Sequence, residues 1–139
     1  MKLGIENEKG VAQLISILQL AKSTDCLIIA KCNELELREL IYEKVSSAFQ
    51  NKICIYKLKI DASNKDLPGI LSKTEVTPDT VFFVYGIEEA MPDALGYLNF
   101  KREVFYKIKR PVVIWVNDFV LKEIATKALD FWAFSGLAH

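Results

Sequence analysis

The chain has few of the residues on which catalytic and metal sites depend. It contains one histidine, His139, and three cysteines, Cys26, Cys32 and Cys54, with no CxxC pair. Nucleophilic catalysis by a Ser–His or Cys–His pair needs a base that a third group orients, and a zinc site needs several ligands at usable spacing. The sequence therefore predicts no catalytic residue and no metal site. An odd number of cysteines beside apolar runs predicts buried, reduced thiols in a cytoplasmic protein.

Excess charge and long apolar runs are also absent. Lys and Arg together number 18, Asp and Glu number 18, and the formal net charge is zero, so nothing draws the whole chain toward nucleic acid or anionic membranes. No apolar run approaches the ~20 residues of a transmembrane helix. A length of 139 residues with 51% apolar and 26% charged residues is typical of a globular protein. We expect residues 1–139 to form a single domain.

Glycine is missing where a nucleotide-hydrolysing fold needs it. The first predicted strand is followed by Lys31, Cys32, Asn33 and Glu34, whereas a phosphate loop needs glycines that let backbone N–H groups approach the phosphates. The glutamate would also repel phosphate at the start of the next helix. A GxGxxG motif is absent as well. This connection predicts that the chain has no nucleotide cofactor.

Apolar patterns predict four strands separated by helices. Short apolar or alternating runs predict strands at residues 26–30, 53–60, 80–85 and 111–116. Apolar residues at helical spacing predict helices at 11–21, 34–49, 92–108 and 119–127, with one helical turn in the polar loop 61–77. Strands that alternate with helices are typical of an α/β fold with right-handed crossovers. The sequence predicts a three-layer sandwich with a mostly parallel sheet.

The composition of the strands predicts which of them are neighbours. Residues 80–85 and 111–116 are almost wholly apolar, as central strands covered by helices on both faces must be. The run 53–60 places Lys57 and Lys59 on one face, and edge strands tolerate lysine. We therefore expect 80–85 and 111–116 to be adjacent central strands, with 53–60 at the edge beside 80–85.

Polar residues at two strand ends have the pattern of helix caps. Asn33 precedes the helix 34–49, and Glu36 stands three positions later, as in a capping box. Asn117 or Asp118 precedes the last helix in the same way. Both patterns predict helix capping rather than a catalytic or ligand-binding role.

Three segments resemble a known family. The strings Tyr97-Leu-Asn-Phe-Lys-Arg-Glu103, Arg110-Pro-Val-Val-Ile-Trp-Val116 and Leu129-Asp-Phe-Trp132 are similar to motifs of the NTPase-like module at the head of many bacterial STAND-type and tetratricopeptide-repeat proteins. Those modules carry an LN-x-x-RE helix, a P-x-V-x-W-x strand and a PDFW helix end; Leu129 replaces the proline of the last motif. The resemblance implies an AAA/STAND-like sheet in a P-loop-NTPase-like order, 1-4-3-2. It also implies a fifth strand, short or absent, for which residues 134–139 remain.

The resemblance implies a non-catalytic regulatory or protein-interaction module of a bacterial signalling system, with defence as one setting. Its partner would be another protein, a covalently linked domain or a second copy of the chain. The residues implied for the interaction are Tyr97, Asn99, Arg102, Glu103 and Trp132.

An alternative is an atypical nucleotide-binding enzyme that uses Lys31, Glu88 and Asn117 at the carboxyl ends of three strands. Hydrolysis is not expected, because Tyr85 and Gly86 stand where a hydrolytic NTPase carries its acidic metal ligand. Nucleic-acid binding is disfavoured too, since the cations between residues 101 and 110 fit a solvated helix face.

Overall fold

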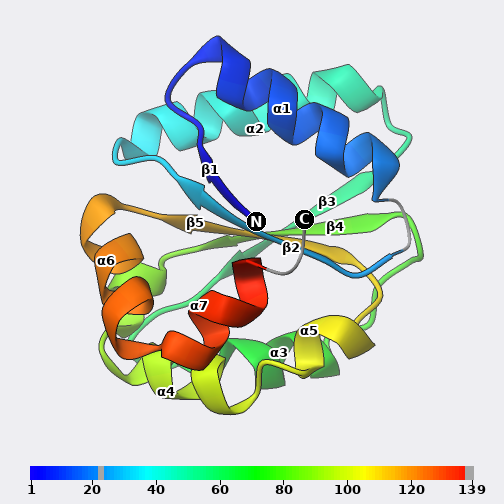
Figure 1. Ribbon diagram of the computed structural model, residues 1–139. Coiled ribbons are helices and arrows are strands. Elements are labelled where there is room, and N and C mark those ends of the chain that lie inside the picture. The colour runs from blue at the N-terminus through cyan, green and yellow to red at the C-terminus, as the bar shows by residue number, and fades with distance from the viewer. Residues whose placement is uncertain (22–23, 137–139) are drawn as a thin grey trace.

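Five parallel strands form the middle layer of the fold (Figure 1). The computed structural model describes residues 1–21 and 24–136. The sheet has the order β1-β2-β5-β4-β3, and each strand pairs in parallel with its neighbour. The strands are β1 (Lys2–Gly4), β2 (Cys26–Lys31), β3 (Cys54–Lys59), β4 (Thr80–Tyr85) and β5 (Pro111–Val116). The expected α/β class with a parallel sheet is confirmed.

Helices cover both faces of this sheet (Figure 1). On one face lie α1 (Glu8–Leu20) and α2 (Leu35–Phe49). The other face carries α3 (Leu67–Lys73), the 3-10 turn η1 (Ile87–Ala90), α4 (Asp93–Phe100), α5 (Val104–Lys107), α6 (Asp118–Lys127) and α7 (Leu129–Gly136). No helix in the described ranges is both long and apolar enough to cross a membrane.

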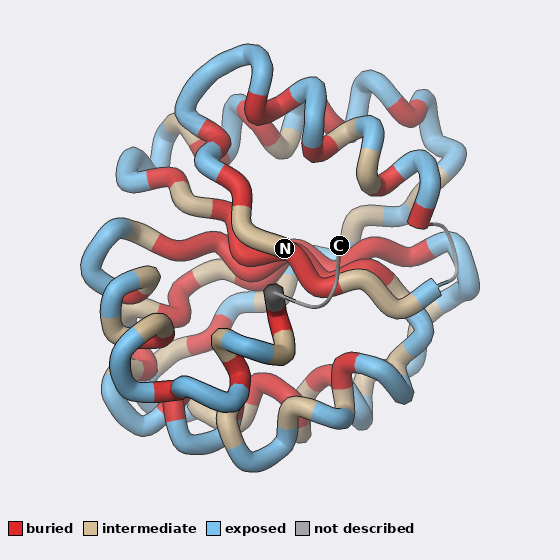
Figure 2. The backbone as a smooth tube through the Cα atoms, in the orientation of Figure 1, coloured by how far each residue is buried: buried red, intermediate tan, exposed pale blue. Residues whose placement is uncertain are grey.

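Alternating residues of the central strands divide the core into two halves. In β5, Val113 and Trp115 face α1 and α2, whereas Val112, Ile114 and Val116 face the opposite helices. All six residues of β5 are buried, and the red stretch through the middle of Figure 2 follows these strands. A strand with helices on both faces must be apolar on both, which is why its sequence shows no alternation.

The predicted neighbours within the sheet are confirmed. β4 pairs with β5, and β3 pairs with β4 at the edge. Lys57 and Lys59 of β3 bind Glu39 at 2.8 Å and Glu89 at 2.9 Å. Lysines on this outer strand therefore reach carboxylates at the surface instead of entering the core.

The predicted order 1-4-3-2 holds for the four predicted strands, which follow one another as β2, β5, β4 and β3, but it is not the order of the whole sheet, and the fifth strand predicted from residues 134–139 is wrong. The sheet has five strands in the order β1-β2-β5-β4-β3, because Lys2–Gly4 adds a strand beside β2. Residues 129–136 form helix α7, and 137–139 lie outside the described residues. A three-residue strand with one buried residue, Leu3, is too short to show a periodicity.

Two helical predictions also needed correction. The loop 61–77 contains α3, seven residues long and capped by Asp66, which accepts the N–H of Gly69 at 2.9 Å. The single helix expected at 92–108 is two helices, α4 and α5. Arg102 donates to the carbonyl of Asn99 at 2.7 Å, the oxygen that the N–H of residue 103 would use in a continuous helix.

The cysteines are not all buried as expected. Cys32 is buried and Cys26 is half-buried, but Cys54 is exposed. Cys54 begins the edge strand β3, whose outer side pairs with no other strand of the part of the chain that the structure describes. All three are free thiols.

Candidate functional site

The carboxyl ends of β2 and β5 mark the place where this topology favours a ligand. The chain leaves β2 toward α2 on one face and leaves β5 toward α6 on the other (Figure 1). Open α/β sheets bind ligands in the crevice where neighbouring strands diverge in this way. Lys31 ends β2 and Asn117 follows β5. Two of the three residues in the nucleotide-binding hypothesis therefore border the crevice.

Asn33 and Asp118 bridge this crevice with two reciprocal hydrogen bonds. Nδ2 of Asn33 donates to Oδ2 of Asp118 at 2.9 Å, and Oδ1 of Asn33 accepts the backbone N–H of Asp118 at 2.8 Å. The predicted capping of α2 by Asn33 is wrong: its N-cap is Glu34, which makes no side-chain capping bond among the described residues. Asn33 bonds to the start of α6 instead. Asp118, the first residue of α6, provides both a carboxylate and a backbone N–H that has no partner within the helix.

Lys31 is held by two carboxylates. Its Nζ lies 2.5 Å from Oε1 of Glu6 and 3.4 Å from Oδ1 of Asp118. The hydrogen bond with Glu6 raises the pKa of Lys31 and lowers that of Glu6. The other oxygen of Glu6 accepts the N–H of Asn33 at 3.4 Å. A carboxylate of the chain thus lies beside the lysine that ends β2 and the backbone N–H of Asn33 that follows it, where a phosphate loop would bind its anion.

Asn117 caps α6, as one of the two predicted capping residues. Its Oδ1 accepts the N–H of Val120 at 2.8 Å. This bond satisfies one of the four backbone donors that a helix leaves open at its start. The position of Asn117 is therefore explained by the helix that it begins.

Glu88 pairs with a buried arginine that the sequence analysis missed. Nη1 of Arg38 lies 3.2 Å from Oε1 of Glu88, and Nε of Arg38 donates to the carbonyl of Cys32 at 2.9 Å. The Arg38 side chain is only 2% exposed. Arg38 has the helical spacing of Ile41 and Val45, the buried residues of α2, and this spacing was the signal available in the sequence. The pair ties α2 to the carboxyl ends of β2 and β4.

A pocket of about 270 Å³ lies beside this ion pair. Its lining includes Arg38, Glu88 and Tyr85, and each carries a buried polar atom without a hydrogen-bond partner among the described residues: Nη2, Oε2 and the phenolic oxygen. Burial raises the pKa of the Tyr85 hydroxyl, which therefore stays neutral. These three atoms are buried beneath the lining of the pocket, whereas Leu35, Lys59 and Glu89 on its rim are exposed.

Three of the residues implied by the family resemblance hold the C-terminal helix in place. Oδ1 of Asn99 accepts the N–H of Phe131 in α7 at 2.9 Å. Arg102 binds the Asn99 carbonyl and lies 4.0 Å from Asp130. Trp132 is half-buried, with Nζ of Lys2 4.0 Å from the centroid of its ring. These side chains connect α4, α7 and β1.

Among the residues implied by the family resemblance, Tyr97 presents an aromatic ring at the surface of α4. It is 39% exposed and lies one turn from Phe100, which is 83% exposed. A hollow of about 440 Å³ on the outer face of α4 is bordered by both rings and by Gly96. Glu103, the remaining residue of the set, is exposed beyond the end of α4. The outer face of α4, meaning Gly96, Tyr97 and Phe100, is thus an exposed apolar surface.

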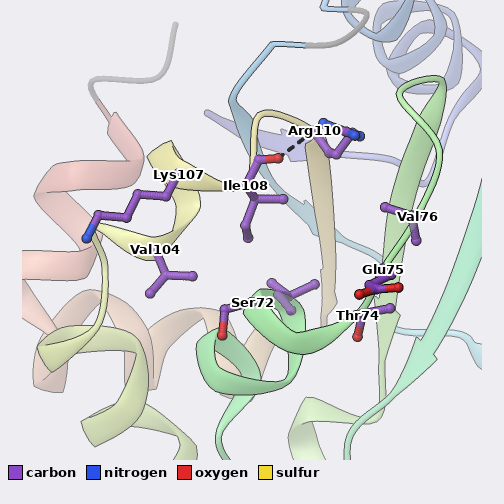
Figure 3. Close-up of a pocket in the computed structure, with 9 residues that line it drawn as sticks. Ser72, Thr74, Glu75, Val76, Val104, Lys107, Ile108 and Arg110 are labelled. Atoms are coloured by element: carbon purple, nitrogen blue, oxygen red, sulfur yellow. Dashed lines mark hydrogen bonds between the residues drawn. The ribbon is translucent and has the colours of Figure 1, made fainter.

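A further pocket, of about 390 Å³, lies between α3 and α5 (Figure 3). Val76, Val104 and Ile108 give it apolar walls, and Arg110 closes its upper end by donating to the carbonyl of Ile108 at 3.3 Å. Arg110 begins the approach to β5, so this pocket lies at the amino end of the sheet. Ligands of open α/β sheets bind at the carboxyl end.

The described residues contain no group of three or more His, Cys, Asp or Glu side chains able to hold a metal ion. Comparison with protein-family models, curated proteins and solved structures found no match.

Proposed function

We propose that the chain is a non-catalytic, NTPase-like regulatory or protein-interaction module of a bacterial signalling system in the cytoplasm, with defence as one setting. The observation that carries this proposal is the bridged crevice at the carboxyl ends of β2 and β5. Asn33 and Asp118 bond to each other there, and Glu6 binds Lys31. A nucleotide phosphate would have to displace contacts that the chain already makes.

The chemistry around the crevice supports the same proposal. Phosphoryl transfer needs a backbone cradle, a lysine for the phosphates and a carboxylate that holds Mg²⁺. Here the lysine is neutralised by Glu6, and the residue that ends β4 is Tyr85. Glu88, one turn further, is bound by Arg38. Each of the required parts is either missing or bound to another residue of the protein.

The outer face of α4 is the proposed contact surface. Exposed aromatic rings beside a hollow are the kind of surface that partner proteins cover. Tyr97 and Phe100 provide the rings, and Lys101 and Asp93 border the hollow. The partner would be another protein, a linked domain or a second copy of the chain.

Calorimetric titration with Mg-ATP and Mg-GTP tests the non-catalytic part of the proposal. We expect no saturable heat with either nucleotide and no phosphate release above a control without protein. Sub-millimolar affinity that disappears in Lys31→Ala would favour the nucleotide-binding enzyme instead. Phosphate release that Glu88→Gln abolishes would do the same. Lys44→Ala, which removes an exposed lysine of α2, is the matched control.

A further inference from the structure

The outer face of α4 has opposite charges at its two ends. Asp93 begins the helix and Lys101 follows its last residue, so they lie about two turns, or about 12 Å, apart along the helix axis. Gly96, Tyr97 and Phe100 stand between them on the same side of the helix. All five residues are exposed. The helix therefore presents to solvent an apolar middle with an acid at one end and a base at the other.

A face of this kind is complementary to a second copy of itself. When two identical helices pack antiparallel across a two-fold axis, the start of each helix faces the end of the other. With the axis beside Tyr97, midway along the face, Asp93 of each copy lies opposite Lys101 of the other. Opposite charges attract in that arrangement, whereas parallel packing would bring like charges together. The order of the charges along α4 thus favours one orientation of one partner.

Both charges have a partner in their own chain and remain accessible to a second one. Nζ of Lys65 lies 2.7 Å from one oxygen of Asp93, and Nζ of Lys101 lies 2.6 Å from one oxygen of Asp66. The side chains of Asp93 and Lys101 are still 57% and 44% exposed. An ammonium group has three donors, and a carboxylate accepts at two oxygens. Two ends that meet would therefore form an alternating network of four charges.

The middle of the face supplies the apolar contact. Phe100 is 83% exposed, and the hollow of about 440 Å³ lies beside Gly96. A Cβ added at Gly96 would meet nothing within 4 Å apart from its immediate surroundings in the helix. In the antiparallel arrangement, the Phe100 ring of one copy lies over the turn between Asp93 and Gly96 of the other, where this space is open. Aromatic side chains that fill such a space contribute strongly to protein contacts.

We propose that two copies of the chain form a symmetric dimer by antiparallel packing of α4 on α4. This inference rests on the proposed interaction function and names its partner. The formal net charge of zero leaves no overall repulsion between the copies. Because the face is only about two turns long, the dimer should belong to the weak, reversible class that has small interfaces.

Charge reversal followed by mixing tests the antiparallel arrangement. Sedimentation of the unaltered chain at rising concentration should show a monomer–dimer equilibrium. Asp93→Lys places two lysines opposite each other and Lys101→Asp places two aspartates opposite each other, so each variant alone should dimerise about tenfold more weakly. A one-to-one mixture of the two variants should regain dimers, because every lysine then faces an aspartate. The same charge changes at exposed positions of α2, Glu43→Lys and Lys44→Asp, should alter the affinity much less, alone or mixed.

Gly96→Gln tests the apolar contact while preserving the fold. Glutamine favours a helix more than glycine does, so the midpoint of thermal unfolding should rise. Its side chain, however, fills the space that Phe100 of the other copy needs. We expect dimerisation to weaken about tenfold or more. Near-ultraviolet circular dichroism establishes that each variant is folded.

Any of four results would overturn the dimer. The unaltered chain could stay monomeric at every concentration that remains in solution, which would leave the outer face of α4 to a different protein. The single charge variants, or Gly96→Gln, could dimerise as tightly as the unaltered chain. The mixture of folded charge variants could fail to regain dimers. None of these results bears on the proposed lack of catalysis, whereas saturable binding of Mg-ATP by an intact dimer would contradict that function and leave the dimer standing.

Discussion

A single arginine shows most clearly how this fold uses charge in its interior. Arg38 is 2% exposed on the buried side of α2, between apolar layers, and contacts both the Cys32 carbonyl and Glu88. Burying a guanidinium costs free energy that only good partners offset. Its partners come from the ends of two different strands. Arg38 can therefore make both contacts only when α2 packs in its native position on the sheet.

Arg38→Ala should lower the free energy of unfolding by about 3 kcal/mol, because it leaves a carboxylate and a carbonyl without their donor. Urea unfolding measures this loss. Glu88→Gln keeps a hydrogen bond to Arg38, so it should cost clearly less. If Arg38→Ala costs less than about 1 kcal/mol, as an exposed pair would, the interior role assigned to Arg38 is wrong.

Tyr85 predicts how stability depends on alkaline pH. Burial raises the pKa of its hydroxyl in the folded chain, whereas an unfolded tyrosine titrates near about 10. The folded state therefore holds the proton more tightly, and the stability linked to Tyr85 is complete below that pH and lost as pH rises above it.

Urea unfolding at several pH values should show Tyr85→Phe losing less stability above about pH 10 than the unaltered chain. Tyr106→Phe, at a position 48% exposed, serves as the control and should keep the full pH dependence. Identical curves for Tyr85→Phe and the unaltered chain would contradict this account.

At the scale of elements, the contact between Asn33 and Asp118 joins the segment that precedes α2 to the start of α6. The two helices lie on opposite faces of the sheet, so few other contacts link their first turns. Hydrogen bonding by Asn33 lowers the pKa of Asp118. Because the pKa of Asp118 is lower in the folded state, the stability that its charged carboxylate contributes is present at neutral pH. That stability is lost as pH falls below the ordinary aspartate value of about 4.

Asn33→Ala should remove both hydrogen bonds and lower the free energy of unfolding only slightly, because both bonds are exposed to water. The more specific result is faster hydrogen exchange at the Asp118 amide, which Asn33 accepts at 2.8 Å. The Val120 amide, bonded to Asn117 instead, should change much less. Unchanged exchange at Asp118 would show that the bridge does not persist in solution.

A substitution on the outer face of α4 should weaken self-association without changing the free energy of unfolding. Phe100 is 83% exposed, so Phe100→Ser should change the free energy of unfolding by no more than about 0.5 kcal/mol. Sedimentation at rising protein concentration should show less self-association than for the unaltered chain, because an exposed apolar ring has been removed. Leu20→Ser, at the 87% exposed end of α1, is the control on another element, and an equal effect there would count against the α4 surface.

At the scale of the whole molecule, we expect the two halves of the core to unfold together, because both are built on the same strands. Ile28 and Ile29 are consecutive residues of β2, both fully buried, and they face opposite helix layers. Ile28→Ala and Ile29→Ala should each cost about 2–5 kcal/mol. Both variants should unfold in a single transition with coincident fluorescence and circular dichroism, because each core needs the same strands. A biphasic curve for either variant would show that one helix layer unfolds independently.

Much of the layer architecture could be predicted from local patterns. Strands β4 and β5 begin and end at the predicted residues. An apolar run of six residues is too short for a helix, and the residues that bound it mark where the strand starts and stops. The edge position of β3 followed from its lysines. The strand β1 could not be predicted, because three residues carry no period and only the pairing with β2 defines them. The site was less predictable still: Lys31 and Asn117 stand where expected, but Glu6, Asn33 and Arg38 contact them or their surroundings only through the tertiary fold.

The sequence by itself determined the α/β class, the parallel strands and the lack of a glycine-rich phosphate loop. These are local properties, since hydrophobic period and backbone freedom are set by neighbouring residues. Only the tertiary structure decided what occupies the carboxyl edge of the sheet. Asn33 bonds to Asp118, which is 85 positions away, and Arg38 bonds to Glu88, which is 50 positions away. The partner of a polar side chain at that distance depends on how strands are ordered in the sheet, which no local pattern records.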